Sequence, residues 1–465
     1  MYLPVRAKTY YIETHGCQMN EHDSEKISGL LSHHGLLPVQ SLAEADLFVL
    51  NTCSVREKAV QKVYSRLGEL KDRKREDRNF AVAVIGCVAQ QEGEEMVKRA
   101  PQVDFVLGTH QFHALPDLID DLGKQRTEAN ANPSVQTGFQ SEKAPTETQW
   151  INRTAAFRAN VTIMEGCNKR CAFCVVPFTR GPERNRPADQ ILKEVQQAAD
   201  KGYVEILLLG QTVNNYKDPT NSRYRFASLL ADTASVPGLR RVRFTSPHPR
   251  NFTSDVIQVI AANETICNQV HLPIQSGSSK ILKRMRRQHD RGWYMDLVEQ
   301  IRNCGRDIAL STDVIVGFPG ESDSDFEETL SLVEAVRFEQ MFSFKYSVRP
   351  NTEAEPWDDD VPEEVKSRRL WTLQRMQREI QLNLHKSAYL GKEFEILTEG
   401  TAKDRVRRFG RTCSNKVVNF RGKEEPGEFI NVTITGAGPN SLIGEKSDLL
   451  LHDESGLLSG ARRSI

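Results

Sequence analysis

Between residues 8 and 123, short apolar runs alternate with segments whose apolar residues recur at helical spacing. The apolar runs are KTYYIET at 8–14, DLFVLNT at 46–52, AVAVIGC at 81–87 and VDFVLGT at 103–109. Such runs predict buried strands, and the segments between them predict helices. Strands and helices in alternation form a parallel sheet with helices on both faces. We therefore expect one α/β domain over residues 7–124.

A polar segment rich in Pro, Asn and Thr follows over residues 125–152, and it predicts a mobile linker. A second series of strands and helices occupies residues 153–383. Its six predicted strands are ANVTIME (159–165), EILLLG (205–210), RVRFTS (241–246), QVHLPI (269–274), IALSTDVIVG (308–317) and MFSFKYS (341–347). A closed TIM barrel has eight such units, so six predict an open, partial βα barrel.

The last part of the chain changes its pattern. After WDDDVPEE at 357–364, an amphipathic helix of roughly 25 residues is predicted. Residues 386–450 then read as alternating strands with Gly and Asn turns, which predict a small antiparallel, OB-like barrel. The fold class is therefore α/β in three parts: a flavodoxin-like parallel sheet, a partial TIM-type barrel and a small β-barrel.

Composition places the chain among globular proteins and favours metal chemistry for its cysteines. Of its 465 residues, 38% are hydrophobic and 27% are charged, and the formal net charge is zero. No apolar run reaches membrane-spanning length, and the N-terminal sequence lacks the pattern of a secretory signal, so we expect a cytoplasmic protein. Nine cysteines in such a chain favour reduced thiols that serve a metal over disulfides.

Three cysteines stand close together in EGCNKRCAFCVVP, at residues 165–177. Cys167, Cys171 and Cys174 follow the first strand of the second series, at the end of the barrel where active sites form. Thiolates suit zinc or iron–sulfur clusters, but structural zinc takes four ligands and the neighbouring sequence offers no fourth. A 4Fe–4S cluster held by three thiolates leaves one iron open to a small molecule. Zinc and plain buried thiols remain the alternatives.

A second set of three cysteines belongs to the first domain. Cys17, Cys53 and Cys87 are far apart in sequence, yet each follows a predicted strand and precedes a predicted helix. The ends of neighbouring parallel strands meet at one edge of the sheet, so these thiols can converge. Helix N-termini nearby favour thiolates. We therefore predict a second metal cluster with one open iron.

Two groups of arginines are candidates for RNA contacts. Residues 403–423 carry eight Lys or Arg against one Asp, and Phe409 and Phe420 lie within this run. Basic side chains with interleaved aromatic rings suit phosphates and stacked bases, although a solvated face is the alternative. The run supplies Arg405, Arg407, Arg408 and Arg411, and TRGPERNR beside Cys174 supplies Arg180, Arg184 and Arg186.

The remaining cysteines and histidines suggest no further site. The spacing of Cys267, Cys304 and Cys413 matches no metal motif, so these residues are interpreted as ordinary thiols. His248 is expected at most to lie at the mouth of the barrel.

The C-x3-C-x2-C spacing at Cys167 resembles that of the radical S-adenosylmethionine enzymes. In that family the open iron binds S-adenosylmethionine, and one electron from the cluster cleaves it to a 5′-deoxyadenosyl radical. The resemblance implies cofactor contacts for residues that follow later strands: Gln211 in LLLGQTVNNY, Gln275 in HLPIQSGS and Asp313 in TDVIVGFPGE. Ordinary turn chemistry is the alternative for each. Beyond the cluster cysteines, no catalytic residue is identified.

Nearly the whole chain resembles the methylthiotransferases, a radical S-adenosylmethionine subfamily with a C-terminal TRAM barrel. The motifs that resemble its tRNA-modifying branch are ETHGCQMNEHDSE, NTCSVREKA, GCVAQQEGE, EGCNKRCAFCVVPFTRGPERNRP and YSVRPNTEA. The resemblance implies two 4Fe–4S clusters, S-adenosylmethionine, and conversion of N6-dimethylallyladenosine at tRNA position 37 to its 2-methylthio derivative. It also implies an anticodon stem-loop as substrate, an electron donor and a sulfur source. We expect a monomer that does not bind membranes.

Two alternatives remain open from the sequence. One is a methylthiotransferase that acts on another tRNA adenosine or on a ribosomal protein. The other is a non-catalytic iron–sulfur or zinc protein that binds RNA and senses redox state. The second alternative does not require a βα barrel behind the cysteine loop, and it predicts bound metal without cleavage of S-adenosylmethionine.

Overall fold

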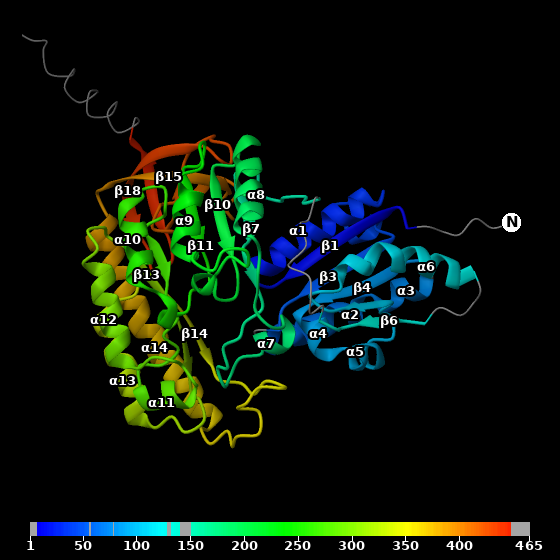
Figure 1. Cartoon of the computed structure of the whole chain (residues 1–465), viewed down its shortest axis with the longest axis horizontal. Helices are drawn as coiled ribbons and strands as arrows, with labels where there is room; N and C mark the ends of the chain where they lie inside the picture. The colour runs from blue at the N-terminus through cyan, green and yellow to red at the C-terminus, as the bar shows by residue number, and fades with distance from the viewer. Residues whose placement is uncertain (1–6, 55–56, 78, 128–131, 140–149, 448–465) are drawn as a thin grey trace, which may run out of the picture.

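The computed structural model describes residues 7–54, 57–77, 79–127, 132–139 and 150–447. Figure 1 shows an N-terminal α/β domain beside a larger strand-and-helix domain, with a small β-barrel on the larger domain. This arrangement confirms the three predicted parts. No helix among the described residues is long and apolar enough to cross a membrane.

The N-terminal domain is a parallel sheet of six strands in the order β2-β1-β3-β4-β5-β6. The flavodoxin-like order is therefore confirmed. The strands are β1 (Thr9–His15), β2 (Leu37–Pro38), β3 (Leu47–Thr52), β4 (Ala81–Gly86), β5 (Phe105–Leu107) and β6 (Ser134–Gln136). The helices are α1 (Gln18–His33), α2 (Glu57–Glu69), α3 (Lys71–Glu76), α4 (Cys87–Glu92), α5 (Glu94–Arg99) and α6 (Leu115–Thr127). Every residue of β3 and β4 is buried, because separate apolar clusters pack on the two faces of the sheet.

The predicted linker at 125–152 is wrong in its described parts, which are fixed to the first domain. Residues Ser134–Gln136 form the edge strand β6, which pairs in parallel with β5. Trp150 stacks on His33 of α1 with ring centroids 3.7 Å apart, and the Asn152 N–H donates to the Glu25 carbonyl. A three-residue edge strand shows no apolar periodicity, so the sequence pattern could not reveal it. Residues 128–131 and 140–149 of the predicted linker lie outside the described residues.

The central domain contains the six predicted strands, and all of them are parallel. They form two sheets, β11-β10-β7 and β12-β13-β14, and an isolated parallel bridge between Val242 and Ile266 continues the first towards the second. The strands are β7 (Arg158–Thr162), β10 (Glu205–Leu209), β11 (Arg241–Phe244), β12 (Gln269–His271), β13 (Ala309–Val316) and β14 (Gln340–Lys345). The larger helices are α8 (Ala188–Asp200), α9 (Phe226–Ala234), α10 (Ser254–Ala262), α12 (Arg291–Arg302), α13 (Asp323–Val336) and α14 (Glu363–Leu384). The open, partial barrel is confirmed.

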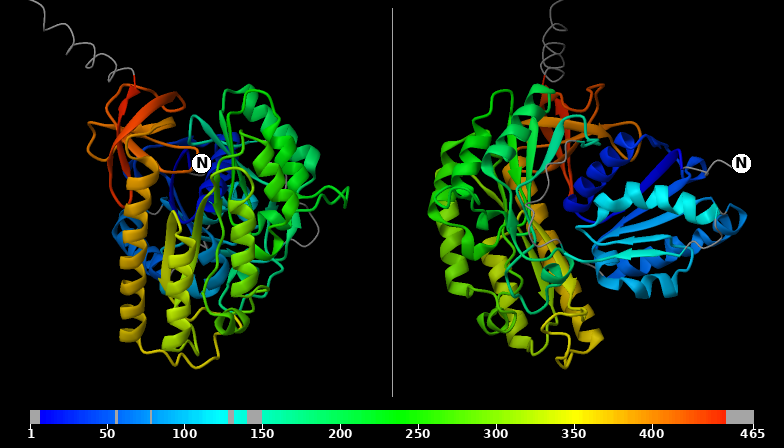
Figure 2. Two further views of the ribbon diagram at one scale, coloured as in Figure 1. Left: turned by 90° about the vertical axis from the view of Figure 1, so that its left-hand side faces the viewer. Right: turned by 45° about the vertical axis from the view of Figure 1, so that its right-hand side comes forward.

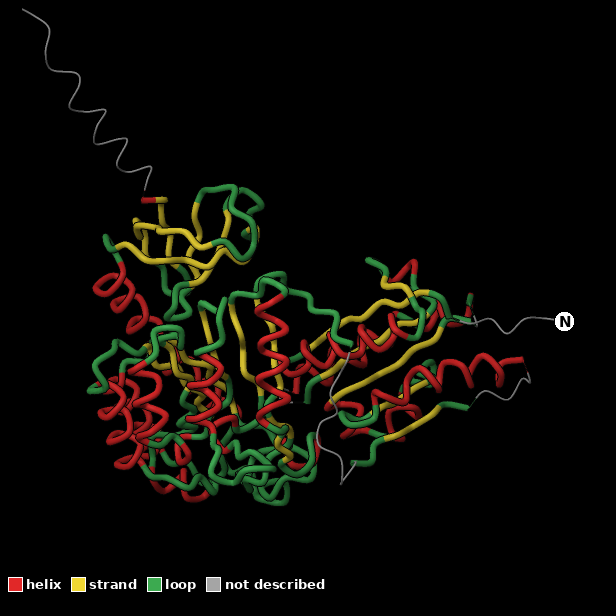
Figure 3. Tube along the Cα trace, turned by 45° about the horizontal axis from the view of Figure 1, so that its top comes forward, coloured by secondary structure: helices red, strands yellow, loops and turns green. Residues whose placement is uncertain are grey.

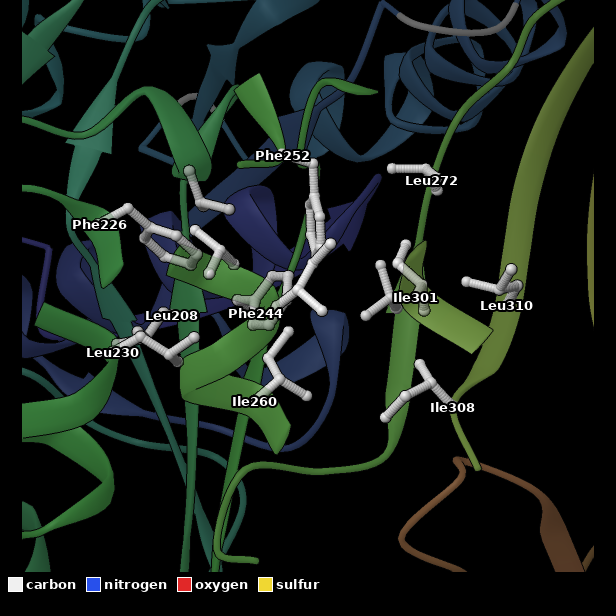
Figure 4. Packing of buried hydrophobic residues seen from close by; sticks show 14 of the residues in the cluster. Leu208, Phe226, Leu230, Phe244, Phe252, Ile260, Leu272, Ile301, Ile308 and Leu310 are labelled. Atoms are coloured by element: carbon white, nitrogen blue, oxygen red, sulfur yellow. The ribbon is translucent and has the colours of Figure 1, made fainter. Parts of the chain in front are cut away.

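One apolar core joins the strands of the central domain to the helices outside them. Figure 4 shows Phe226 of α9 and Phe244 of β11 within it, and their rings meet edge to face at 5.3 Å. Ile260 of α10 and Ile301 of α12 belong to the same cluster. Such continuous packing holds the carboxyl ends of the six strands in fixed positions, and the cysteine loop lies at these ends.

The C-terminal domain is a closed barrel of five strands in the order β15-β16-β17-β19-β18 (Figure 3). Its strands are β15 (Glu393–Thr401), β16 (Arg408–Arg411), β17 (Val417–Phe420), β18 (Phe429–Ala437) and β19 (Leu442–Lys446). Helix α14 leads into this domain along the outside of the central domain, as the two views of Figure 2 show.

The barrel is attached to the amino ends of the central strands. Arg241, the first residue of β11, donates from Nη1 to the Arg411 carbonyl at 2.7 Å. Arg243 donates from Nη2 to the Thr412 carbonyl at 3.0 Å. The cysteine loop follows the carboxyl end of β7, so the barrel and the cysteine loop lie at opposite ends of the central strands.

Candidate metal centres

The loop that carries Cys167, Cys171 and Cys174 is fixed by backbone hydrogen bonds. It follows β8 (Met164–Glu165) and leads into the short helix α7 (Val176–Thr179). The Cys167 N–H donates to the Gly181 carbonyl at 3.1 Å, and the Cys174 N–H donates to the Cys171 carbonyl at 3.0 Å. Gly166 opens the loop with φ of +73°, and a Cβ there would lie 2.0 Å from the Pro182 oxygen. A glycine is therefore required at this point.

The three cysteines line one cavity, with a volume of about 160 Å³, at the carboxyl ends of the central strands. The predicted cofactor-binding residues Gln211, Gln275 and Asp313 line the same cavity. Gln211 Oε1 is buried and has no hydrogen-bond partner among the described residues. A soft three-thiolate set beside an unsatisfied acceptor fits a cluster that also binds a polar ligand.

Donors surround the sulfur atoms in this cavity. Arg287 Nη1 lies 3.6 Å from Cys171 Sγ, and the Lys169 N–H and the Thr212 hydroxyl each lie 3.4 Å from Cys167 Sγ. Burial and the charge of Cys171 raise the pKa of the Cys174 thiol to about 12. Positive groups and N–H donors offset such a penalty when thiolates bind iron.

His248 at the cavity and His289 beside it stay neutral at physiological pH. His248 lines the cavity, as the sequence allowed, and burial together with Arg287 holds its pKa far below the usual value. Burial and Arg287 likewise lower the pKa of His289, whose ring lies 5.9 Å from that of His248, to about 3. Neither ring therefore adds positive charge to the mouth of the barrel.

Two residues at the cavity have left-handed backbone conformations without being glycine. Ser246 follows β11 with φ of +53°, and Gln275 has φ of +73°. The Gln275 N–H donates to the Asp313 carbonyl, and its own carbonyl accepts from the Ile315 N–H, both at 2.9 Å. The strained backbone is therefore held by β13. Such strain is concentrated at functional sites, and here it fixes the side chain that faces the cavity.

The other cysteine set lies at the carboxyl edge of the N-terminal sheet. Cys17 precedes the first residue of α1, Cys53 follows β3, and Cys87 begins α4 directly after β4. Asn20 of α1 donates from Nδ2 to Asn51 Oδ1 and to the Thr52 carbonyl, both at 3.1 Å. These bonds join the start of α1 to the end of β3, so they bring Cys17 and Cys53 together.

Thiols of this set interact with one another and with one arginine. The Cys53 thiol hydrogen-bonds to Cys17 and lowers the pKa of Cys17 to about 6, and the charge of Arg180 acts in the same direction. Burial raises the pKa of Cys87, and Arg180 beside it opposes this effect. Cys17 therefore lies beside Cys53, and its charge also raises the pKa of Cys87, whereas a metal centre on the three thiols stays a prediction. No group of three or more Cys, His, Asp or Glu in the described part of the chain is arranged to hold a single metal ion.

Of the arginines predicted beside the cysteine loop, Arg180 and Arg184 contact the N-terminal domain, and Arg186 pairs within the central domain. Arg180 is 4% exposed and pairs with Asp23 at 2.7 Å, and Arg186 is 6% exposed and pairs with Glu194 at 2.8 Å. Arg184 Nη2 lies 3.0 Å from Glu165 Oε2. Burial removes Arg180 and Arg186 from tRNA phosphates in this structure, which corrects their assignment as RNA contacts.

Most of the predicted barrel arginines pair with nearby acids. Arg407 pairs with Asp404 at 2.7 Å, Arg408 with Glu425 at 2.9 Å and Arg411 with Glu399 at 3.1 Å. Arg405 is exposed in a turn with φ of +59°. Phe420 is fully buried in the barrel core, so its predicted role in stacking a base is wrong.

Sequence reasoning missed three features of these sites. Arg287 carries no motif, because its contact with Cys171 forms only in the folded chain, whereas the contact of the Lys169 N–H with Cys167 lies within the cysteine motif itself. Arg180 was assigned to RNA because its partner Asp23 lies in another domain. Cys267 and Cys413, predicted as unrelated thiols, hydrogen-bond to each other where the barrel meets the central domain.

Comparison with protein families divides the chain as the structure does. Residues 9–108 match the uncharacterized protein family UPF0004, residues 161–333 match the radical SAM superfamily, and residues 387–446 match the TRAM domain. The two cysteine sets thus lie in separate matched regions, and the basic run lies in the third.

Similar curated proteins match over nearly their full length. A tRNA-2-methylthio-N(6)-dimethylallyladenosine synthase from Solibacter usitatus is 45% identical over 96% of this chain and 99% of its own. The synthase of the same name from Carboxydothermus hydrogenoformans is 46% identical over 92% of this chain and 97% of its own. Among solved structures, the radical S-adenosylmethionine methyltransferase TsrM from Kitasatospora setae has a TM-score of 0.54 at 13% identity, covering 75% of each chain, which shows a shared fold.

Proposed function

This chain belongs to the tRNA-2-methylthio-N(6)-dimethylallyladenosine synthases, and we propose that it inserts sulfur and a methyl group at C2 of N6-dimethylallyladenosine at tRNA position 37. The observation that carries the proposal is the pair of three-cysteine sets, each at the carboxyl edge of its own parallel sheet. The enzyme is a transferase of the radical S-adenosylmethionine class. We propose one 4Fe–4S cluster on each set.

The protein's own residues divide the work between the two centres. When bound, the cofactors supply sulfur at the first centre and one-electron cleavage of S-adenosylmethionine at the second. Cys167, Cys171 and Cys174 would hold the cluster of the second centre, and Gln211, Gln275 and Asp313 would orient the polar groups of S-adenosylmethionine in the shared cavity. Cys17, Cys53 and Cys87 would hold the other cluster. Helix α4 of the first domain packs against α7 of the second, so both centres would act on the same substrate.

The substrate base must leave its stack to reach this cavity. Position 37 lies in a single-stranded anticodon loop, where the cost of displacing a base is modest. Arg184, at the interface beside the cysteine loop, and the arginines of the barrel are the remaining candidates for phosphate contacts. We place the reaction in the cytoplasm and expect a monomer that uses an external electron donor and sulfur source.

A non-catalytic RNA sensor would not require the cavity that Cys167, Cys171 and Cys174 line. Its unsatisfied acceptor on Gln211 and its strained backbone at Gln275 favour a bound polar cofactor. The direct test is mass spectrometry of tRNA nucleosides from a strain that lacks this enzyme. Expression of the chain should restore the 2-methylthio derivative of dimethylallyladenosine. The control is that the expressed protein is folded and carries its clusters. If dimethylallyladenosine stays unmodified under that condition, the proposed substrate is wrong.

A comparison of two triple variants tests the division between the centres. Replacing Cys167, Cys171 and Cys174 by Ala should abolish 5′-deoxyadenosine, because S-adenosylmethionine would lose its cluster. Replacing Cys17, Cys53 and Cys87 by Ala should retain that cleavage and eliminate the methylthio product. Anaerobic iron and sulfide analysis should give about half the wild-type content for each variant. Loss of cleavage in both variants, with each still folded, would show that the roles are assigned wrongly.

A further inference from the structure

Arg180 belongs to the central domain, but its side chain lies against the N-terminal domain near the cysteine set of that domain. It directly follows α7, and α7 packs against α4, the helix that Cys87 begins. Its guanidinium pairs with Asp23 of α1 at 2.7 Å, less than two turns from Cys17 at the start of that helix. The side chain therefore crosses the domain interface to the edge where the three thiols converge.

Backbone contacts from both domains hold Arg180 in place. Its N–H donates to the Val176 carbonyl at 2.8 Å, and its carbonyl lies 3.1 Å from His110 Nε2. The preceding carbonyl, of Thr179, accepts from the Thr109 hydroxyl at 2.7 Å. His110 and Thr109 belong to the N-terminal domain. The position of the guanidinium is therefore fixed by packing between domains.

The guanidinium is charged, buried and incompletely satisfied. Burial opposes the charge, but Asp23 and the thiols of Cys87 and Cys17 more than offset this effect and hold the pKa of Arg180 far above its usual value. Arg180 Nη2 is buried and lies 2.7 Å from Asp23 Oδ2, but outside hydrogen-bond geometry. A buried guanidinium whose nearest acceptor is poorly aligned is stabilised by a further acceptor beside it.

We propose that Arg180 holds the anionic sulfur of the N-terminal centre, donating an N–H to it and stabilising its negative charge from across the domain interface. The inference rests on the proposed function, because it assumes a cluster on Cys17, Cys53 and Cys87. The residue supplies a fixed positive charge and a hydrogen bond, and Asp23 limits that charge by pairing with it. The sulfur donor would then be held correctly only while the two domains are docked.

The test is the midpoint potential of this cluster, measured by electron paramagnetic resonance in an anaerobic redox titration. The measurement uses the full chain with Cys167, Cys171 and Cys174 replaced by Ala, so that the N-terminal cluster alone contributes, and it needs no tRNA. Arg180→Met should shift the potential to more negative values, because a positive charge near a cluster favours its reduced form. A tenfold change in the one-electron equilibrium corresponds to about 59 mV. Asp23→Asn should shift the potential in the opposite direction, and Arg180→Lys should retain most of the wild-type value.

Arg186→Met is the matched control, because Arg186 is equally buried but pairs with Glu194 and the Thr162 carbonyl. It should leave the potential unchanged. Unchanged potentials in both Arg180→Met and Asp23→Asn, with wild-type iron content, would overturn the assignment. If Arg180→Met fails to keep its iron, Asp23→Asn decides alone. An absent tRNA product with shifted potentials would instead point to a wrong substrate, so the two failures are distinguishable.

Discussion

Gln211 is the clearest single residue for contact with S-adenosylmethionine. Its buried Oε1 belongs to the lining of the cysteine cavity and has no partner in the part of the chain that the structure describes. We expect Gln211→Ala to weaken S-adenosylmethionine binding roughly fivefold, the effect of about one hydrogen bond. Equilibrium binding to reconstituted enzyme measures this effect. Iron content should stay at the wild-type level, since the three cysteines are unchanged, and equal affinity in variant and wild type would exclude the contact.

Cys413 is a thiol with a lowered pKa, which its sequence context does not reveal. The hydrogen bond from Cys267 lowers the pKa of Cys413 to about 6, against an ordinary value near 9, and the Asn268 N–H lies 3.4 Å from its sulfur. A depressed pKa means that the thiolate stabilises the fold. This contribution is complete above the ordinary thiol pKa and is lost as the pH falls through about 6.

This pKa predicts the pH dependence of alkylation. At pH 7 Cys413 should react with iodoacetamide faster than Cys304, a half-buried thiol outside this pair, as followed by peptide mass spectrometry. Its rate should fall as the pH drops below about 6. Cys267→Ala should slow the reaction of Cys413 at pH 7 several-fold by removing the hydrogen-bond donor. Equal rates for Cys413 in the variant and the parent would contradict the pairing.

Gly166 determines the path of the loop that carries the second cysteine set. Its φ of +73° and the 2.0 Å approach of the Pro182 oxygen to a built Cβ exclude any other residue without rearrangement. Gly166→Ala should therefore displace the loop and lower the iron content of the reconstituted enzyme to about half. Gly202→Ala is the control, because Gly202 has φ of +87° and nothing within 4 Å of its Cβ position. That variant should lose about 1–2 kcal/mol of stability and keep its iron.

At the scale of whole elements, apolar runs predicted the buried strands well. Strands β3 and β10 are buried on both faces, so each is a continuous apolar run in the sequence. Edge strands β2 and β6, of two and three residues, were too short to leave such a pattern. Helix α1 shows a different failure of the pattern. Its Asp23, Glu25 and Lys26 are buried against the central domain, which no periodicity within the helix could indicate.

The two cysteine sets show the same difference between features that are local in sequence and features that depend on contacts between domains. The positions of the six cysteines at strand ends could be predicted, because strand ends and spacing are local in sequence. Their electrostatic surroundings could not, because these depend on contacts between domains. Burial raises the pKa of Glu165, but the charges of Lys26 and Arg184 more than offset this effect and hold it at about 2. This carboxylate therefore stays ionised, and it belongs to the ion-pair network that docks the two domains.

At the scale of the whole molecule, the barrel and the cysteine cavity lie at opposite ends of the central strands. Strand β13 has 8 residues, which corresponds to about 25 Å. An RNA that contacts both must therefore extend along the central domain. The barrel side chains best placed for phosphates are exposed basic residues, namely Lys403, Arg405, Arg421 and Lys423. Arg407, Arg408 and Arg411 are partly neutralised by acidic neighbours.

Neutralising these two groups separately should give different results. Replacing the four exposed residues by Gln should weaken binding of an anticodon stem-loop and reduce the slope of log affinity against log salt by up to about 3–4. The matched variant replaces Arg407, Arg408 and Arg411 by Gln and should change the slope less, because their acidic partners already screen them. Titrations at two salt concentrations measure both slopes.

The preference for the dimethylallyl-modified base should persist in each variant, since phosphate contacts position the RNA and do not read its bases. If the four-fold variant keeps the wild-type affinity and slope, the exposed basic residues are a solvated face, and Arg184 becomes the next residue to test for RNA binding.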